Sequence, residues 1–526
     1  MRESKGQPVH GFEVLSLCIA AAAIIASCVV DSQRRLFWGD EVATALAVSD
    51  ESFSHMLTAL KDEFNAMPPL YFVVGWIWVR IFGASELSLR LPAAFFVVVG
   101  IVAIWAALRR FMSRWPATYC AIVLPLLVGT IRYHICEARC YALYFAAYAI
   151  AVALYLHCTG RHDRSLLFYI SVVLVHGVLV GVHYVGGLFS ALIVIAALLS
   201  WKFDGDVRFF RYGLSALLGW IAVIPAVPFL LAQRKISTQH SFIADTQIGD
   251  LIGLIGGGDI AHFHLIATFM LLGWLVAEWI DDSDVYERVA WRPGREAGHV
   301  AVLMAVTIAF LPAVWLESRW GARIFISRYL FPASVAWVVA IGFVYGGLFE
   351  KLWGLRKQPV SQPLSGSVSP SLRERWLRVT GRSLVCVTAA VLAIGMLAML
   401  ARGRPTNVSA ELERDLAAAR QHSGCPVLTR SGGNFLCLAY YLRLGNRVFL
   451  LTDEWSAEPP LKRHGSDVLE RLYFPDSMRK LPEFLGEHDR FLIVDPTGAL
   501  LQFLAQAPAW EGKEITDRVW LWQRRQ

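Results

Sequence analysis

The sequence is poor in charged residues. Only 17% of its 526 residues are Asp, Glu, Lys or Arg, whereas 56% are hydrophobic, and the mean hydropathy is +0.49. A soluble domain carries about 25% charged residues, so this composition excludes an ordinary soluble enzyme and indicates a polytopic membrane protein. The net charge of +7 does not indicate a nucleic-acid partner, because the basic residues cluster in short loops between apolar runs. Basic residues in such loops set membrane orientation.

Several site patterns are also missing. The nine cysteines are scattered, mostly in apolar segments, and show no metal-ligand spacing. His262 and His264 have no partner at metal spacing, and residues 256–259 lack the lysine and spacing of a phosphate-binding loop. The sequence has no internal repeat, which weighs against secondary transporters built from repeated halves.

Long apolar runs are present instead, and each approaches the roughly 20 residues that cross a bilayer. A signal peptide is the alternative for the first run, but its length favours a retained span. We predict eleven transmembrane helices, at 12–30, 91–108, 117–131, 141–158, 166–182, 185–201, 212–231, 262–280, 299–316, 330–349 and 384–400.

Lys and Arg gather in alternate loops, which predicts the orientation of the chain. With a cytoplasmic N-terminus, the inside loops contain the basic clusters within 109–114, 161–164, 202–211, 288–295 and 351–382. An odd number of spans then places residues 401–526 outside. We therefore expect a multi-pass protein of the inner (plasma) membrane with an extracytoplasmic C-terminal domain.

Two segments outside the spans are predicted to fold. Residues 31–90 form a long, acidic outer loop, and its apolar stretch 69–82 is short for a span, which favours juxtamembrane helices at the interface. Residues 401–526 predict a small α/β domain with a partly parallel sheet. Its Cys425 and Cys437 form either a disulfide or two free buried thiols. Strands are expected at 426–430, 447–452, 491–495 and 519–522, and helices at 434–444 and 499–505.

Ionisable residues near membrane level are energetically expensive and are therefore functional candidates. The predicted outer loops collect them on one side of the membrane, where they can converge on one outward-facing cavity. A carboxylate there can accept a proton from an attacking hydroxyl, and arginines can hold a phosphate. The candidates are Asp40, Glu41, Arg132, His134, Glu137, Arg139, His183, Tyr184, Arg328 and Tyr329.

Six stretches carry a resemblance to a known family. They are Trp38-Gly39-Asp40-Glu41, Asn65-Ala66-Met67-Pro68-Pro69-Leu70-Tyr71, residues 82–92, Glu137-Ala138-Arg139-Cys140-Tyr141-Ala142-Leu143, His183-Tyr184 and Ser327-Arg328-Tyr329-Leu330. In order and spacing the chain resembles the integral-membrane GT-C glycosyltransferases, in the branch of protein O-mannosyltransferases, lipid A aminoarabinose transferases and lipopolysaccharide core-sugar transferases. The resemblance covers the first third of the chain well and the remainder thinly.

The resemblance implies a mainly α, GT-C-like transmembrane domain over residues 1–400 and a separate extracytoplasmic α/β domain over 401–526. It implies an inverting glycosyltransferase that moves a hexose or pentose from a polyprenyl-phosphate donor to a hydroxyl of a cell-envelope glycolipid or protein, on the outer face of the membrane. A multi-pass lipid-sugar flippase or transporter is the alternative. Acids in an outer loop and an appended domain favour an enzyme, because carriers place their key charges near mid-membrane.

The resemblance also implies residue roles. Asp40 is the expected catalytic base, and Glu41 and Glu137 are further catalytic candidates. Arg328, Arg139 and Arg132 are expected to bind the donor phosphate. Neither a cofactor nor a metal is expected; a divalent cation at Asp40 and Glu41 is the less favoured alternative. Residues expected to line the donor or acceptor pocket are Trp38, Pro69, Tyr71, His183, Tyr184 and Tyr329.

Structural explanations compete with these roles. Asp40 and Glu41 suit the start of a helix over 42–48, and Glu137 with Arg139 suits a local ion pair. Arg90 and Arg328 each suit an anchor at the membrane interface. Family members often carry Lys or His before the Pro-Pro-Leu element, where this sequence has Met67.

Overall fold

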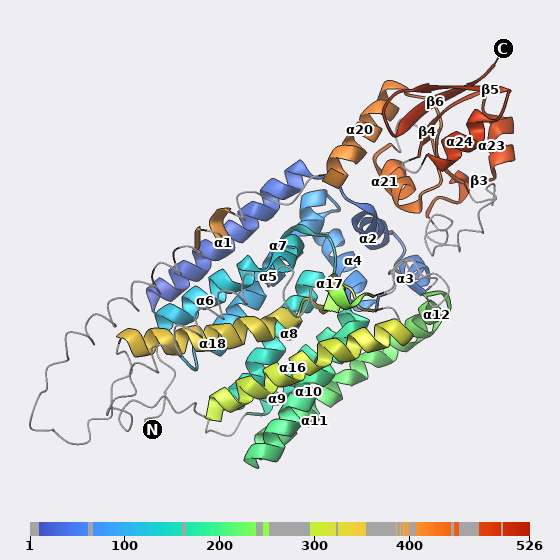
Figure 1. The fold of residues 1–526 in the computed structure, drawn as a ribbon. Helices are drawn as coiled ribbons and strands as arrows, with labels where there is room; N and C mark the ends of the chain where they lie inside the picture. The colour runs from blue at the N-terminus through green and yellow to red at the C-terminus, as the bar shows by residue number, and fades with distance from the viewer. Residues whose placement is uncertain are drawn as a thin grey trace, which may run out of the picture.

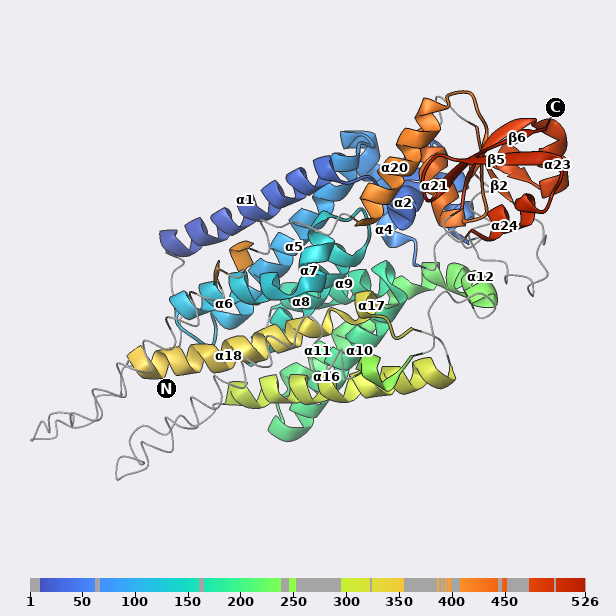
Figure 2. The ribbon, with the colours of Figure 1, turned by 45° about the horizontal axis from the view of Figure 1, so that its top comes forward.

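The structure, a computed structural model, describes residues 10–61, 67–159, 165–237, 246–251, 295–321, 324–353, 407–442, 447–451, 473–495 and 498–525, with a few positions between 386 and 398. A bundle of apolar helices makes up most of it, and a small α/β domain sits at one end of the bundle (Figures 1 and 2). The predicted class, a mainly α polytopic protein with a C-terminal α/β region, is confirmed.

Two helices of the bundle pack closely where a glycine permits it. Gly100, on α5 (Glu86–Leu108), lies against the ring of Phe145, on α8 (Tyr141–His157). A Cβ at position 100 would come within 2.3 Å of that ring. The bundle elements are α1 (Gly11–Arg34), α5 (Glu86–Leu108), α6 (Arg114–Leu127), α8 (Tyr141–His157), α9 (Leu166–Val182), α10 (Tyr184–Asp204), α11 (Val207–Gly219), η2 (Trp220–Ala226), α12 (Val227–Ser237), α16 (Arg295–Trp320) and α18 (Ala333–Trp353).

Five helices within the described residues are long and apolar enough to cross a membrane, or six if one bent pair counts as a span. The five overlap the predicted spans 12–30, 91–108, 185–201, 212–231 and 299–316. The predictions 141–158, 166–182 and 330–349 correspond to shorter apolar helices. Span 262–280 and most of 384–400 lie outside the described residues, so the total of eleven stays a prediction.

The predicted span 117–131 is a bent pair of helices and not one straight helix. Helix α6 ends at Leu127, and the chain turns by 77° into α7 (Gly129–Tyr133) and η1 (His134–Cys136). Pro125 lies just before the break, and Arg132 donates from Nη1 to the carbonyls of Leu126 (2.8 Å) and Leu127 (2.9 Å). Helix ends need such partners for their last carbonyls. The turn directs residues 134–139 toward the first outer loop.

The segment between α1 and α5, which the sequence predicts to be the first outer loop, contains α2 (Gly39–Ser49), α3 (Phe53–Lys61) and α4 (Leu70–Phe82). Side chains of α4 satisfy the C-terminal end of α2: Trp76 Nε1 donates to the carbonyl of Asp50 (2.8 Å), and Arg80 Nη1 donates to that of Val48 (3.1 Å). Helix α4 therefore braces α2. Its placement at a membrane interface remains a prediction.

The C-terminal domain contains a six-stranded sheet of order β3-β2-β1-β4-β6-β5. Strands β3, β2, β1 and β4 are parallel, and β6 and β5 are antiparallel, so the sheet is partly parallel as predicted. Cys425 and Cys437 are buried and are not joined in a disulfide. The elements are α20 (Asn407–Gln421), β1 (Val427–Thr429), α21 (Gly432–Leu442), β2 (Val448–Leu451), η4 (Pro475–Ser477), β3 (Met478–Arg479), α23 (Leu481–Glu487), β4 (Arg490–Val494), α24 (Ala499–Ala505), β5 (Trp510–Glu514) and β6 (Val519–Arg524).

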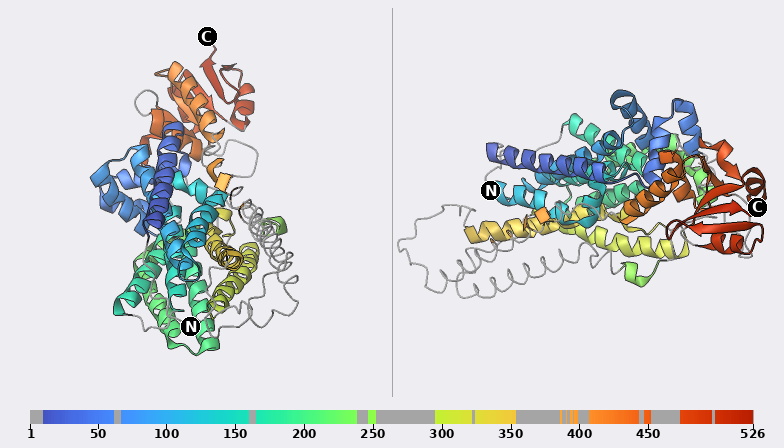
Figure 3. Two further views of the ribbon diagram at one scale, coloured as in Figure 1. Left: turned by 90° about the vertical axis from the view of Figure 1, so that its left-hand side faces the viewer. Right: turned by 90° about the horizontal axis from the view of Figure 1, so that it is seen from above.

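The sequence predictions omitted five of these elements: α20, η4, β3, α23 and β5. Strand β3 has only two residues, and β5 reads Trp-Glu-Gly-Lys-Glu, with four of its five residues exposed. Charged residues and glycine are depleted in strands. Figure 3 shows the domain, coloured orange to red, at one end of the helical bundle in both views.

Candidate active site

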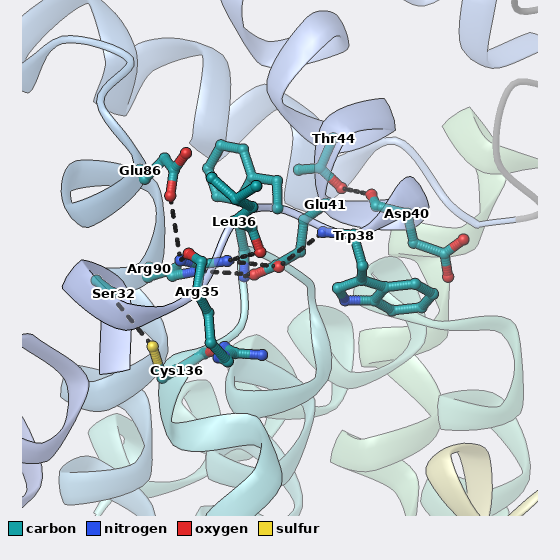
Figure 4. A network of polar contacts seen from close by, with 12 residues as sticks. Ser32, Arg35, Leu36, Trp38, Asp40, Glu41, Thr44, Glu86, Arg90 and Cys136 are labelled. Carbon is teal, nitrogen blue, oxygen red and sulfur yellow. Dashed lines mark hydrogen bonds and ion pairs between the residues drawn. The ribbon is translucent and has the colours of Figure 1, made fainter. Parts of the chain in front are cut away.

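Asp40 and Glu41 lie in the first turn of α2, where two acidic side chains suit the positive end of the helix dipole. Trp38 is the N-cap residue, and its backbone N–H donates to Glu41 Oε2 at 3.4 Å. The helix-start explanation of this pair is therefore correct. It does not exhaust their roles, because the two carboxylates point in different directions (Figure 4).

Glu41 is fully buried, and three donors hold its carboxylate in addition to the backbone N–H of Trp38. Arg90 donates from Nε to Oε1 (2.9 Å) and from Nη2 to Oε2 (2.8 Å), and the backbone N–H of Ala138 donates to Oε1 (2.9 Å). Burial raises the pKa of Glu41, but the hydrogen bonds and charge of Arg90, with the charge of Arg35, outweigh it and hold that pKa below its ordinary value. The carboxylate is ionised and enclosed, so this structure gives it no direct path to a substrate.

One interpretation of the sequence made Arg90 an anchor at the membrane interface. The structure contradicts this interpretation. The side chain of Arg90 is 0% exposed. Besides binding Glu41, it donates to the carbonyls of Arg35 (2.8 Å) and Leu36 (3.0 Å). Arg90 thus fixes the extended link between α1 and α2 from inside the protein.

Asp40 is the accessible acid of the pair. Its side chain is 36% exposed, and its Oδ2 lies 3.5 Å from Nη2 of Arg139 and 3.6 Å from Nη1 of Arg328. Arg139 follows η1, and Arg328 lies on the short helix α17 (Ser327–Leu330), so three distant segments meet at one carboxylate. Both guanidiniums remain charged at physiological pH. One carboxylate between two cations leaves a net positive centre, which suits a phosphate.

Arg139 is buried and rigidly held. It donates from Nη1 to the carbonyl of Asp40 (3.3 Å) and to Thr44 Oγ1 (3.4 Å), and its Nη2 lies 3.9 Å from the sulfur of Met67. Met67 occupies the position where the family resemblance leads one to expect Lys or His. Arg139 therefore supplies a positive charge beside that position.

Buried polar groups without a hydrogen-bond partner among the described residues surround this centre. They are Nε1 of Trp38, the hydroxyl of Tyr141 and Nε2 of His183. The rings of Tyr141 and His183 are 5.9 Å apart, and Arg139 lies 5.9 Å from the ring of Tyr141. An orphaned buried polar group needs an explanation, and a bound ligand is one.

His183 is a neutral donor in this setting. Val185 donates its backbone N–H to Nδ1 (3.2 Å), which leaves the proton on Nε2. Burial, and then the charges of Arg139 and Arg328, lower the pKa of His183 to about 3. Its ring also contacts that of Tyr329, at a centroid distance of 4.8 Å.

Trp38 and Tyr329 frame Arg328. The guanidinium lies 6.0 Å from the ring of Trp38 and 5.6 Å from that of Tyr329. Cation–π contacts of this kind hold an arginine in place without occupying its N–H donors. Of the predicted site residues, the structure thus brings together Asp40, Arg139, Arg328, Trp38, His183 and Tyr329.

Other predicted site residues make hydrogen bonds away from the Asp40 carboxylate. Arg132 closes the end of α6, as described above, and Glu137 is a buried partner of His134 Nδ1. Tyr184 donates to Gln233 Oε1 (2.8 Å). Pro69 is the N-cap residue of α4, and Tyr71, also on α4, is partly buried. Tyr71 and Glu137 are nevertheless close enough to Arg139 to interact with its charge.

Arg90 and Tyr141 were not predicted as site residues, although both lie in stretches that carry the family resemblance. Their buried polar contacts depend on segments far away in the chain, and no local pattern reports them.

A cavity of about 390 Å³ opens beside the far end of α2, where Asp50, His55 and Tyr473 line it. Within the described residues, no three His, Cys, Asp or Glu side chains form a metal-ligand cluster.

The chain shares its fold with solved GT-C glycosyltransferases, so the predicted resemblance is confirmed at the level of the fold. ArnT from Cupriavidus metallidurans is similar in structure, both bound to undecaprenyl phosphate (TM-score 0.58, 15% identity, 98% of each chain) and in the apo state (TM-score 0.58, 15% identity, 97% of each chain).

An oligosaccharyltransferase from Archaeoglobus fulgidus, tethered to an acceptor peptide, is similar over 85% of this chain and 64% of its own (TM-score 0.50, 13% identity). No family model matches the sequence, and no curated protein matches it significantly. At these identities the likeness establishes the fold, so the activity must be argued from the site itself.

Proposed function

We propose that the chain is an inverting glycosyltransferase that moves a sugar from a polyprenyl-phosphate donor to a hydroxyl acceptor. The observation that carries the proposal is the position of the Asp40 carboxylate between Arg139 and Arg328, at 3.5 and 3.6 Å. A base for the acceptor and a clamp for the leaving phosphate are the two groups that this reaction needs, and here they are adjacent.

The reaction follows from these groups. The acceptor hydroxyl attacks the anomeric carbon, the bond from that carbon to the phosphate oxygen breaks, and the hydroxyl proton passes to Asp40. The departing polyprenyl phosphate gains negative charge, which Arg139 and Arg328 stabilise. Attack from the face opposite the phosphate inverts the anomeric centre.

The ion pairs also suggest an order of events. Without donor, the two arginines pair with the Asp40 carboxylate. A donor phosphate competes for the same N–H groups, which releases the Asp40 carboxylate from that pairing and leaves its oxygens open to the acceptor hydroxyl. Donor binding therefore comes before proton transfer.

The orphaned polar groups fit the same site. Trp38 Nε1, the Tyr141 hydroxyl and His183 Nε2 are donors that a sugar or phosphate oxygen can satisfy. The solved ArnT structure with undecaprenyl phosphate supports a polyprenyl-phosphate donor. We further propose that the site opens to the outer face of the inner membrane and that the acceptor is a cell-envelope glycolipid or protein.

The test is Asp40→Asn in the full-length chain, reconstituted in liposomes with labelled polyprenyl-phosphate sugars and envelope extract as acceptor. We expect the transfer rate to fall by about 10²–10⁴, with membrane insertion and undecaprenyl phosphate binding retained. The matched control is Glu51→Gln, an exposed acid of the same loop. Full transfer by the Asp40→Asn variant would remove the proposed base. Movement of the labelled lipid across the bilayer without transfer would favour the flippase.

A further inference from the structure

The C-terminal domain packs against the segment that carries Asp40. Helix α21 packs on α2, and Gly433 in its first turn lies against Gly39, where a Cβ would be 3.6 Å from the Gly433 Cα. The two helices therefore meet at the residue that precedes Asp40.

Two side chains of α21 bind the main chain of Phe37, three residues before Asp40. The backbone N–H of Phe37 donates to the Tyr441 hydroxyl (2.6 Å), and the Cys437 thiol contacts the Phe37 carbonyl (3.7 Å). Residues 437 and 441 are one turn apart, so they lie on the same face of the helix. Both polar groups of one backbone residue are thus taken by the C-terminal domain.

Tyr441 also reaches the ion pair behind the site. Its hydroxyl donates to Glu86 Oε1 (2.6 Å), and Glu86 Oε2 lies 3.5 Å from Nη1 of Arg90. Arg90 in turn holds Glu41, whose Oε1 accepts the backbone N–H of Ala138. A continuous set of polar contacts therefore runs from α21 to Glu41 and Ala138. These two residues are the chain neighbours of Asp40 and Arg139.

We propose that α21 is a positioning element of the candidate active site and that Tyr441 is its positioning residue. This inference rests on the proposed function. The hydroxyl of Tyr441 touches no reacting atom; it fixes Phe37 and Glu86, and through them the direction in which Asp40 faces Arg139 and Arg328. The C-terminal domain is then required for turnover itself, beyond any part it has in choosing an acceptor.

The test compares Tyr441→Phe with Tyr473→Phe in the full-length chain. Tyr473 also bonds the first outer loop, through Asp50 Oδ2 at 3.0 Å, but at the opposite end of α2. Each variant removes one hydroxyl between the domain and the loop, so a merely structural effect is common to both. Two quantities are measured: hydrogen exchange of the backbone amides of residues 37–44, and the kcat and KM of glycosyl transfer.

For Tyr441→Phe we expect faster exchange at residues 37–44 and a kcat about tenfold lower, with the KM for donor and acceptor within about twofold. Tyr473→Phe should leave both near wild type. Unchanged exchange and kcat in Tyr441→Phe, or equal losses in both variants, would overturn the inference. If Tyr441→Phe does not fold, Glu86→Gln tests the same contact from α5 with the same expected pattern.

The two proposals fail in different ways. Faster exchange at 37–44 in Tyr441→Phe, with no transfer by the wild-type chain, would refute the glycosyltransferase and leave the contact as a conformational feature. Transfer by the wild-type chain that Tyr441→Phe does not slow would keep the enzyme and refute the positioning role.

Discussion

Arg90 and Glu41 form a bidentate ion pair, with N–O distances of 2.9 and 2.8 Å, in which both side chains are 0% exposed. The pair joins α5 to the first turn of α2 and turns Glu41 inward, so that its neighbour Asp40 faces the arginines of the site. Removing one partner of a buried pair leaves an uncompensated buried charge, which is far more costly than removing both. The two adjacent acids are therefore expected to respond differently to mutation.

Glu41→Gln should destabilise the chain by about 3–5 kcal/mol, because the buried Arg90 keeps its charge and loses its bidentate partner, with only Glu86 left at 3.5 Å. Asp40→Asn should leave stability near wild type, since Asp40 is partly exposed. Thermal unfolding of both purified variants in one detergent checks the contrast. Equal stability of the two variants would mean that the Glu41–Arg90 pair does not hold the loop.

The double variant Glu41→Leu with Arg90→Met separates stability from activity. Replacing a buried pair by apolar residues of similar size is often neutral, so most of the lost stability should return. Transfer should stay low, because α2 is no longer held by polar contacts of defined direction. Recovery of full transfer would show that the pair serves stability alone.

The sequence predicted the apolar helices within the described residues and the partly parallel sheet, because the length of an apolar run is a local property. It predicted Asp40, Arg139 and Arg328 as site residues through motifs near membrane level. It preferred Asp40 to Glu41 as the base only through the family resemblance, since the inward position of Glu41 depends on Arg90, 49 positions away in the chain. The contact of Tyr441 with Phe37 joins residues 404 positions apart, and no local pattern encodes it. The break after Leu127 was missed because its residues are as apolar as those of a continuous span.

Arg328→Gln should weaken binding of undecaprenyl phosphate by about 10- to 100-fold, the worth of a hydrogen bond to a charged group. Arg328 faces Asp40 through Nη1 and is held by two aromatic rings, so its loss removes a fixed cation. Quenching of tryptophan fluorescence in the full-length chain measures the affinity. Arg319→Gln is the control, because Arg319 donates to the carbonyl of Thr246. Similar affinities for both variants would remove Arg328 from the phosphate site.

Arg132→Ala should behave as a helix-end mutation. The carbonyls of Leu126 and Leu127 lose their charged donor, which costs about 1–2 kcal/mol of stability. The affinity for undecaprenyl phosphate should stay within about twofold of wild type. A loss of affinity comparable with that of Arg328→Gln would restore Arg132 to the phosphate site that the sequence suggested.

The carboxyl group of Asp415, on α20, should make the stability of the C-terminal domain depend on pH. Its side chain is 3% exposed, and its Oδ1 is a buried oxygen with no hydrogen-bond partner among the described residues. Burial raises its pKa to about 6, although Arg518 lies 3.3 Å away and opposes the shift. A raised carboxyl pKa means that the folded chain binds the proton more tightly than the unfolded chain. This contribution to stability is therefore present at low pH and is lost as the pH rises from about 4 to about 6.

Asp415→Asn should remove this dependence, because an amide needs no proton to be neutral. The variant should be more stable than wild type at pH 7.5, by up to about 3 kcal/mol, and the difference should shrink toward pH 4. Arg518 keeps Glu411 as a partner, so its charge is not stranded in the variant. Hydrogen exchange of α20 and β6 in the full-length chain, measured at both pH values, reports the local free energy of opening. The opposite result would be a variant that is less stable than wild type at pH 7.5 and equally stable at pH 4. That result would show that the ionised Asp415–Arg518 pair stabilises the domain.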